Sequence, residues 1–324
     1  MRPIVSFMLY WTLRFIALNA WLPRSFTLLV SRLGSIVLAA LPVPALERNL
    51  NVISHHLIKR GKTSHKLLQA GGRRQIKKQF YFYMLKNFFD FFRFVVVSRN
   101  GLHGLVTNLG ERDKIVEQFR KERGLIGLCM HLGNWELGAP LLTSAGIELS
   151  SLVFRQIDPG VERFVQGSRK KSNVKLLHQR NGLRQAVRAL QAKEMVTVLC
   201  DQDGTRAGHF QEFFGLQVSY PRVFDLFCSK ADPVLMPMIL LHEGTHYKIR
   251  TFDALESSLV RDNPQVFYEQ LRDWHEEMIT EYPEQWLLVY DRFKFRHDSL
   301  LREQGVYETR RKEYEKAWGK PDLA

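Results

Sequence analysis

Cysteine is scarce in this chain, which has three cysteines among 324 residues. Cys129, Cys200 and Cys228 each lie in an apolar segment that we expect to be buried. Their odd number and wide spacing argue against a disulfide framework and a cysteine zinc site, and they fit a reducing compartment. Internal repeats and low-complexity tracts are also absent, and a hydrophobic content of 45% is enough to bury a substantial core.

Negative charge is scarce as well, most of all in one stretch. Lysine and arginine number 47 against 33 acidic residues, which gives a formal net charge of +14. Between Arg48 and Asp90 there is no acidic residue, and the basic ones include Lys59, Arg60, Lys62, Lys66, Arg73, Arg74, Lys77 and Lys78. This balance indicates acidic partners: anionic lipid, an acidic carrier protein, a phosphorylated substrate or nucleic acid. The run could be a solvated face, but its position after an apolar N-terminus favours an anionic membrane surface.

A signal-peptide cleavage site is missing from the N-terminus, although residues 4–22 are mostly apolar. We therefore expect this stretch to be retained. Arg14 and Asn19 interrupt it, and a second apolar stretch follows at residues 26–42. A spanning helix, an interfacial hairpin and a helix packed on the protein all agree with this pattern. We expect residues 1–45 to anchor the chain at a membrane, at a depth that the pattern leaves open.

Short apolar segments alternate with helix-like segments through most of the chain. We predict strands near 124–130, 150–155, 174–178, 195–200, 234–241 and 246–252, and helices at 135–144, 160–170, 182–192, 221–230 and 264–282. Such alternation indicates an α/β fold with a mainly parallel sheet flanked by helices. We divide the chain into an N-terminal membrane-anchoring helical segment (1–45), a domain (46–300) and a charged tail (301–324). The domain begins with a helical part (46–120), and an α/β core (121–300) follows.

The most informative segment joins a buried strand to a helix. An apolar run at 125–130 ends at His131, Gly133 breaks the strand, and Asn134 is a candidate N-cap for a helix whose first turn holds Glu136. In an open α/β sheet, ligands bind at this end of a strand. A neutral imidazole held by a carboxylate is a general base, so the spacing predicts that Glu136 orients His131. No serine or cysteine lies beside the pair, so the activated hydroxyl would belong to a substrate. In the alternative interpretation, Glu136 has no catalytic role, and it lies at the helix start because the positive end of the helix dipole stabilises its carboxylate.

The segment HLGNWE (131–136) resembles the H-x4-D/E block of the lysophospholipid acyltransferase superfamily, and most closely its bacterial lipid A biosynthesis acyltransferase branch. Further segments agree with that branch: VFR (153–155), DQDG (201–204), FFG (213–215), and PEQW (283–286) leading to DRFK (291–294). The resemblance runs from about residue 41 to residue 294. The chain departs from the family pattern near Leu288, where a second tryptophan is usual, at Asp291, where a basic residue is usual, and over residues 216–222. These departures bear on the acceptor more than on the reaction type.

The resemblance implies a membrane-associated O-acyltransferase on the cytoplasmic face of the bacterial inner membrane. It implies that an acyl group passes from acyl carrier protein to a hydroxyl of a lipid A precursor, a phosphorylated glycolipid, in lipopolysaccharide biosynthesis. His131 and Glu136 would be catalytic, without a covalent intermediate, cofactor or metal. An acyltransferase that uses acyl-CoA, or one that acts on another phospholipid or glycolipid, remains open. A non-catalytic membrane protein or a basic nucleic-acid-binding protein is a further alternative, but no nucleic-acid module is recognisable and we expect no nucleic-acid partner.

Three residues are given substrate-binding roles by their positions. Asn134 begins a helix whose backbone N–H groups could hold a developing oxyanion. Arg155 follows a strand end, and its guanidinium suits a phosphate or carboxylate, unless it pairs with Asp158. Arg169 is the next candidate for binding acceptor phosphates or an acidic carrier.

Two acidic and two aromatic residues complete the candidate site. Asp201 and Asp203 end another strand near the same edge of the sheet. Two carboxylates there could hold a metal, but the resemblance implies no metal and a role in ordering the site. Phe213 and Phe214, with Gly215, are expected to form a loop that lines an apolar acyl tunnel, and a core cluster would look the same in the sequence.

Overall fold

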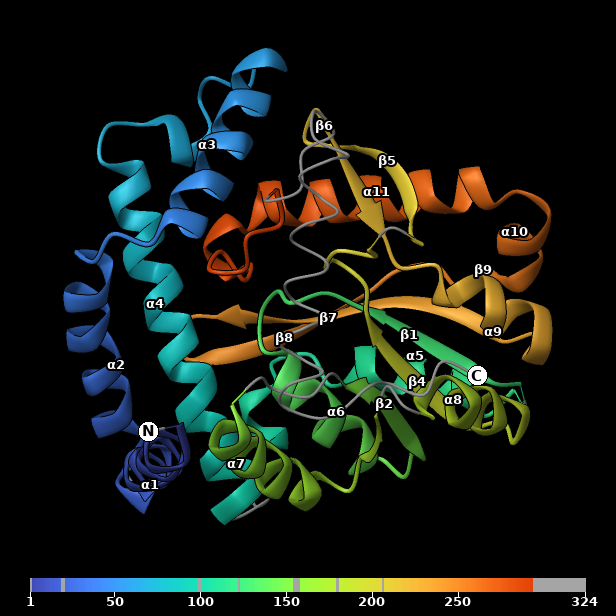
Figure 1. Ribbon diagram of the computed structural model, residues 1–324, viewed down its shortest axis with the longest axis horizontal. Coiled ribbons are helices and arrows are strands. Elements are labelled where there is room, and N and C mark those ends of the chain that lie inside the picture. The colour runs from blue at the N-terminus through green and yellow to red at the C-terminus, as the bar shows by residue number, and fades with distance from the viewer. Residues whose placement is uncertain are drawn as a thin grey trace.

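The centre of the protein is a seven-stranded, mainly parallel sheet with helices on both faces (Figure 1). The computed structural model describes residues 2–18, 21–97, 101–121, 123–153, 158–178, 181–205 and 207–293. Its strands follow the order β3-β2-β4-β1-β7-β8, and β9 pairs with β7. Their bounds are Leu125–Cys129 (β1), Leu149–Val153 (β2), Lys175–His178 (β3), Met195–Leu199 (β4), Val234–Glu243 (β7), His246–Thr251 (β8) and Leu255–Glu256 (β9). The predicted α/β fold is confirmed.

Strand β1 lies in the middle of this sheet, between β4 and β7 and parallel to both. Its side chains alternate between the faces, as the pleat of a strand requires. Ile126 and Leu128 enter one core cluster with α8, α9 and α11, whereas Leu125 enters the other with α5, α6 and α7. A continuous apolar run is therefore needed here, because both faces of the strand are covered.

The helices of the core lie on opposite sides of the sheet, with α11 on one side and α6 on the other (Figure 1). They are Gly110–Phe119 (α5), Trp135–Thr143 (α6), Pro159–Arg169 (α7), Gly182–Gln191 (α8), Val223–Ala231 (α9), Ser257–Asp262 (α10) and Pro264–Glu281 (α11). Each predicted helix of the core has a counterpart with closely similar bounds.

Residues before the sheet form a helical layer along one side of the core (Figure 1). It consists of Arg2–Leu18 (α1), Arg24–Ala39 (α2), Pro44–Lys59 (α3) and Gly72–Phe91 (α4), and α4 continues into a π-helical turn, Phe92–Val97. Helix α2 packs along α4, and α1 packs against α7. Arg24 at the start of α2 forms two hydrogen bonds of 2.9 and 2.8 Å with Asp90 of α4, which is buried. Helix α2 is therefore attached to the domain by a buried ion pair.

The N-terminal helices expose a large apolar surface. Among the described residues, no single helix has the length and apolar character needed to cross a membrane, and α2 and α3 reach that length only jointly, across a bend of 84°. Exposed apolar side chains on α1, α2 and the turn between them include Phe7, Met8, Trp11, Phe15, Leu18, Trp21, Phe26, Leu29, Leu33, Ile36 and Val37. Membrane anchoring by residues 1–45 stays a prediction, and the charged tail at 301–324 lies outside the described residues.

A hairpin, His209–Phe213 (β5) and Leu216–Tyr220 (β6), packs on α11. The sequence interpretation treated residues 213–215 as a loop. Phe213 pairs with Leu216, so Phe214 and Gly215 form a two-residue turn with φ of 50° and 80°. Two positive φ angles are typical of a type I′ hairpin turn, for which asparagine is usual at the first position. Because phenylalanine occupies that position, the sequence carries no clear turn signal.

Candidate active site

Two neighbouring parallel strands bring His131 and Asp201 together. Cys129 at the end of β1 pairs with Leu199 at the end of β4, so both strands finish at the same level. His131 and Asp201 each follow two residues later. Asp201 Oδ1 lies 2.8 Å from His131 Nδ1, and Oδ2 accepts the backbone N–H of His131 at 3.0 Å. The carboxylate therefore holds both the ring and the backbone of the histidine.

A third side chain fixes the carboxylate. Trp286, in the segment after α11, donates its indole N–H to Asp201 Oδ2 at 2.9 Å. Burial by itself would raise the pKa of Asp201, but the charge and hydrogen bond of His131 and the indole N–H outweigh it and lower the pKa to about 2. Asp201 is thus ionised at neutral pH, although its side chain is only 2% exposed.

The hydrogen bond to Asp201 also determines which nitrogen of His131 can act as a base. A carboxylate only accepts, so Nδ1 carries the proton and Nε2 keeps its lone pair in the neutral ring. The side chain is 14% exposed, and the amide nitrogen of Gln202 lies 3.4 Å from Nε2. Nε2 is therefore the atom that can take a proton from a bound hydroxyl.

Glu136 does not occupy the position predicted for it. The carboxylate bonded to His131 is Asp201, whereas Glu136 forms hydrogen bonds of 2.5 and 3.2 Å with Arg169 at the end of α7. Arg169, expected to meet an acceptor phosphate, is the ion-pair partner of Glu136. Burial lowers the pKa of Arg169, and the facing carboxylate of Glu136 outweighs that effect and raises it. The pair joins α6 to α7 beside the candidate base.

The turn after His131 is held by close packing. Gly133 has φ of 73°, and a Cβ atom there would lie 2.1 Å from the carbonyl oxygen of Leu240, so only glycine fits. The predicted N-cap is confirmed, because Asn134 Oδ1 accepts the N–H of Leu137 at 3.1 Å. The backbone N–H of Asn134 donates to the carbonyl oxygen of Leu240 at 2.7 Å, so this N–H is not available to bind an oxyanion. Asn134 Nδ2 donates to the Tyr247 hydroxyl at 2.9 Å.

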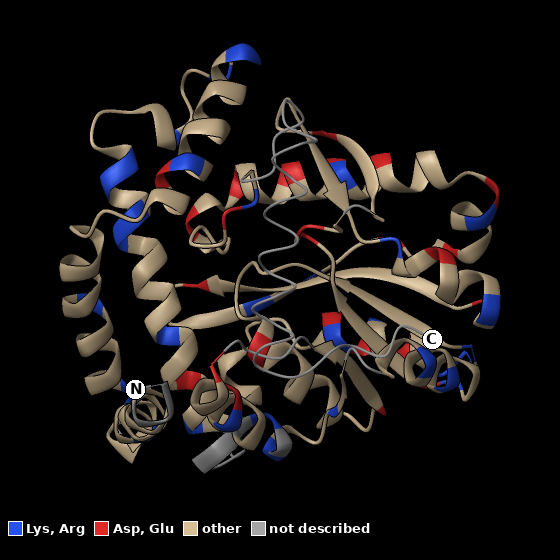
Figure 2. Ribbon diagram, in the orientation of Figure 1, with Lys and Arg blue, Asp and Glu red and all other residues tan. Residues whose placement is uncertain are grey.

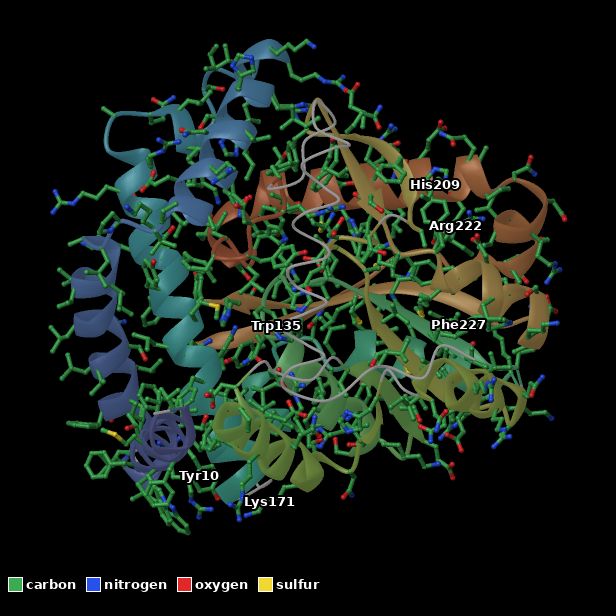
Figure 3. The ribbon with its side chains drawn as sticks, in the orientation of Figure 1. Tyr10, Trp135, Lys171, His209, Arg222 and Phe227 are labelled. Atoms are coloured by element: carbon green, nitrogen blue, oxygen red, sulfur yellow. The ribbon has the colours of Figure 1, made fainter. Side chains whose placement is uncertain are left out.

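An apolar cavity of about 120 Å³ lies beside the site, between α6 and the sheet. Trp135 stands next to it near the middle of the molecule (Figure 3), and its ring meets the His131 ring edge-on at 5.3 Å. Other residues that line the cavity are Gly138, Ala139, Leu142, Leu152, Leu176, Leu199 and Met238. The Glu136–Arg169 pair lines the same cavity. A hydrocarbon chain fits these walls, because they are predominantly apolar.

The other predicted site residues are Arg155, Asp203, Phe213 and Phe214. Arg155 lies outside the described residues. Asp203 is half-buried, and its backbone N–H donates to the Tyr290 hydroxyl at 3.1 Å. Phe213 and Phe214 are 1% and 3% exposed and belong to the core, so they form the alternative core cluster, and the cavity is lined by other residues.

The cysteines are not candidate nucleophiles. Burial raises the pKa of Cys129 to about 12 and that of Cys228 to about 11, and it raises the pKa of Cys200 as well. All three thiols are therefore protonated at neutral pH and weakly nucleophilic.

Gln202 and Trp286 are site residues that the sequence interpretation did not single out. Both belong to segments quoted for the family resemblance, DQDG and PEQW, but neither segment by itself indicates a contact with His131. The sequence signal that could have found them is position: Gln202 follows the end of a strand, and Trp286 follows the end of a helical turn. Only the sheet order brings them to the histidine.

We expect the Glu136–Arg169 pair to contribute mainly to the stability of the fold. Glu136→Gln and Arg169→Gln should each cost about 1 to 3 kcal/mol of stability, because each leaves a partly buried charge unpaired. The double variant should cost less than their sum, because the two side chains interact. Denaturant unfolding of the four proteins measures this coupling, and transfer assays accompany it. Loss of transfer by Glu136→Gln as complete as by His131→Ala would instead place Glu136 in the proton path.

Comparison with known proteins identifies the family of the chain. A search of curated proteins finds no match to the chain. The family model described as bacterial lipid A biosynthesis acyltransferase matches residues 22–295, which include the sheet, the His131–Asp201 pair and Trp286. Members of that family are acyltransferases, and the match covers most of the chain. The chain therefore belongs to the bacterial lipid A biosynthesis acyltransferase family and is an acyltransferase.

Proposed function

We propose that the protein transfers a fatty acyl group from acyl carrier protein to a hydroxyl of a lipid A precursor at the cytoplasmic face of the bacterial inner membrane. The observation that carries the chemistry is the Nε2 atom of His131, backed by an ionised and buried Asp201, beside an apolar cavity. The acyl chain would occupy the cavity, which places its thioester near the imidazole.

In the proposed reaction, His131 Nε2 takes the proton of the acceptor hydroxyl as its oxygen attacks the thioester carbonyl carbon. Asp201 stabilises the imidazolium that forms. The C–S bond then breaks, an ester remains on the acceptor, and the thiolate leaves with the proton from Nε2. The enzyme returns to its starting state, and no acyl-enzyme forms.

Gln202 is proposed to contribute to stabilising the oxyanion. The N–H groups of Gly133, Asn134 and Leu137 already donate to oxygen atoms of the protein. The Gln202 amide nitrogen lies 3.4 Å from His131 Nε2, close to where the attacked carbonyl must sit. A preorganised donor at such a position is worth about 10² to 10³ in rate.

Charge supports an acidic donor and an anionic membrane. Figure 2 shows basic residues on α3 and on the first part of α4, beside α2. Lys59, Arg60 and Lys62 are exposed, whereas Lys77 forms a hydrogen bond of 2.6 Å with Glu47. We propose that the exposed part of this run and the apolar face of α1 and α2 meet the membrane together.

The central experiment is a transfer assay with the purified full chain in detergent. Acyl carrier protein thioester and acyl-CoA are added as donors in separate reactions with a lipid A precursor. The mass of the lipid product is measured by mass spectrometry. We expect a mass gain of one acyl chain with the carrier-protein thioester, and no gain with His131→Ala. Product from acyl-CoA alone would overturn the donor assignment, and transfer only to other lipids would overturn the acceptor assignment.

Acyl-chain length should respond to the volume of the cavity. A Cβ atom at Gly138 meets nothing within 4 Å, so Gly138→Leu can fill the cavity without moving the backbone. Discrimination against longer donors should increase by about fourfold for each methylene that no longer fits. Gly110→Leu, at an equally open helix position outside the cavity, is the control. Competition between donors of different acyl-chain lengths measures this discrimination. An unchanged length preference in Gly138→Leu would show that the acyl chain binds outside this cavity.

Membrane binding should depend on the exposed face of α1. Changing Phe7, Trp11 and Phe15 to Gln should weaken binding of the full chain to vesicles by about tenfold or more, because each exposed apolar side chain loses its transfer into lipid. Changing the exposed Leu183, Phe210 and Val266 to Gln is the control. Vesicle co-sedimentation is the measurement, and equal losses in both sets would contradict anchoring through α1.

A further inference from the structure

A second cavity, of about 400 Å³, lies between α1 and α7. Six of the residues that line it are Tyr10, Arg14, Trp21, Phe92, Arg163 and Lys171. Figure 3 shows Tyr10 of α1 and Lys171, just beyond α7, at the same corner of the molecule. This cavity shares no lining residue with the cavity beside His131, so it is a separate feature of the protein.

Two guanidinium groups converge on one ring in this cavity. Arg14 donates a hydrogen bond of 3.0 Å to the Tyr10 hydroxyl, and its Cζ atom lies 5.8 Å from the centroid of the Tyr10 ring. Arg163 comes from α7, and its Cζ atom lies 5.3 Å from the same centroid. The ring attracts both cations, but the cations repel each other. An anion bound between them would relieve that repulsion.

The charge of the cavity wall has one sign. Arg14, Arg163 and Lys171 line it, and none of the described residues that line it is an aspartate or a glutamate. The other walls are apolar or aromatic, among them Trp21 and Phe92. Cationic groups on an apolar wall match an amphiphile with an anionic head better than a free anion, which would leave the apolar surface unused.

The surroundings indicate where such an amphiphile comes from. Trp11 and Phe15 on α1 are 52% and 73% exposed, and Trp21, which lines the cavity, is 70% exposed. They form an exposed apolar surface on α1 and beside the cavity. The two helices are held in register, because Ser6 donates a hydrogen bond of 2.6 Å to Asp158 at the start of α7. Gly160 permits this approach, since a Cβ atom there would lie 1.9 Å from the carbonyl oxygen of Ser6.

We propose that the cavity between α1 and α7 binds the phosphate headgroup of an anionic phospholipid. Arg14 and Arg163 bind the phosphate, Lys171 adds positive charge, and an acyl chain of the lipid follows the apolar face of α1. The site holds a membrane lipid and takes no part in acyl transfer, so its existence is independent of the donor and acceptor proposed above.

The test is titration of the full chain with short-chain phosphatidylglycerol below its micelle concentration, with phosphatidylcholine as the neutral comparison. Arg14→Gln with Arg163→Gln should weaken phosphatidylglycerol binding by about 25-fold, or about fivefold for each charge. Arg14→Lys with Arg163→Lys should retain most of the binding. Arg184→Gln with Arg188→Gln removes the same charge from the exposed face of α8 and should have no effect.

The outcomes separate the possible ligands. His131→Ala should bind phosphatidylglycerol as the unchanged chain does, which keeps this result apart from any failure of the transfer assay. Displacement of the lipid by an equal concentration of inorganic phosphate would show a phosphate site and overturn the lipid assignment. Equal binding of both lipids, or equal losses in the α8 control, would overturn the headgroup site.

Discussion

His131→Ala is expected to lower the rate of acyl transfer by about 10² to 10⁴ while the fold is retained, because general-base assistance typically supplies that factor. The side chain is 14% exposed and its ring meets the Trp135 ring edge-on, so the variant should lose some stability. Its Nε2 atom acts only as the hydroxyl attacks. The loss should therefore appear in kcat, with little change in the KM for the donor.

The measurement is steady-state transfer with the purified full chain, together with thermal unfolding to show that the variant is folded. His246→Ala, at an exposed histidine on β8, is the matched control and should keep the unchanged rate. A His131→Ala enzyme with near-normal turnover would contradict the general-base assignment.

Asp201→Asn is expected to be nearly as damaging, and it tests the feature that distinguishes the structure from the sequence interpretation. The amide keeps the size of the side chain but can donate to Nδ1, which moves the ring proton to Nε2 and removes the base. A comparable change of the buried aspartate in a catalytic triad costs about 10⁴ in kcat.

The ionised carboxylate of Asp201 also contributes to the stability of the fold. Its folded pKa of about 2 lies below the ordinary value of 3.8, so that stability is present above about pH 4 and is lost as the pH falls through 2.

Transfer rates of Asp201→Asn and Glu136→Gln, measured side by side at neutral pH, decide between the two carboxylates. We expect the loss at Asp201 to exceed the loss at Glu136 by at least about tenfold. Asp253→Asn, at an exposed position, controls for the loss of one negative charge. The reverse order of the two losses would restore Glu136 as the partner of His131.

Local patterns in the sequence were sufficient for most elements of the core. Strand β1 is apolar at both faces, and the segment after it carries a glycine and then an asparagine, which stops the strand and caps the next helix. These signals act over a few residues, so they can be recognised without the rest of the fold. The β5–β6 hairpin was missed because its turn begins with phenylalanine, a residue that seldom adopts positive φ.

The sequence by itself determined the α/β class, the place of His131 at a strand end, the Asn134 cap and the family resemblance. The tertiary structure alone decided which carboxylate meets the imidazole. Glu136 is near His131 along the chain, but the parallel register sets β1 beside β4, and that places Asp201, 70 residues away, against the ring. Glu136 instead pairs with Arg169, because α7 brings that guanidinium to α6. Contacts between strands depend on the order of the whole sheet, which no local pattern encodes.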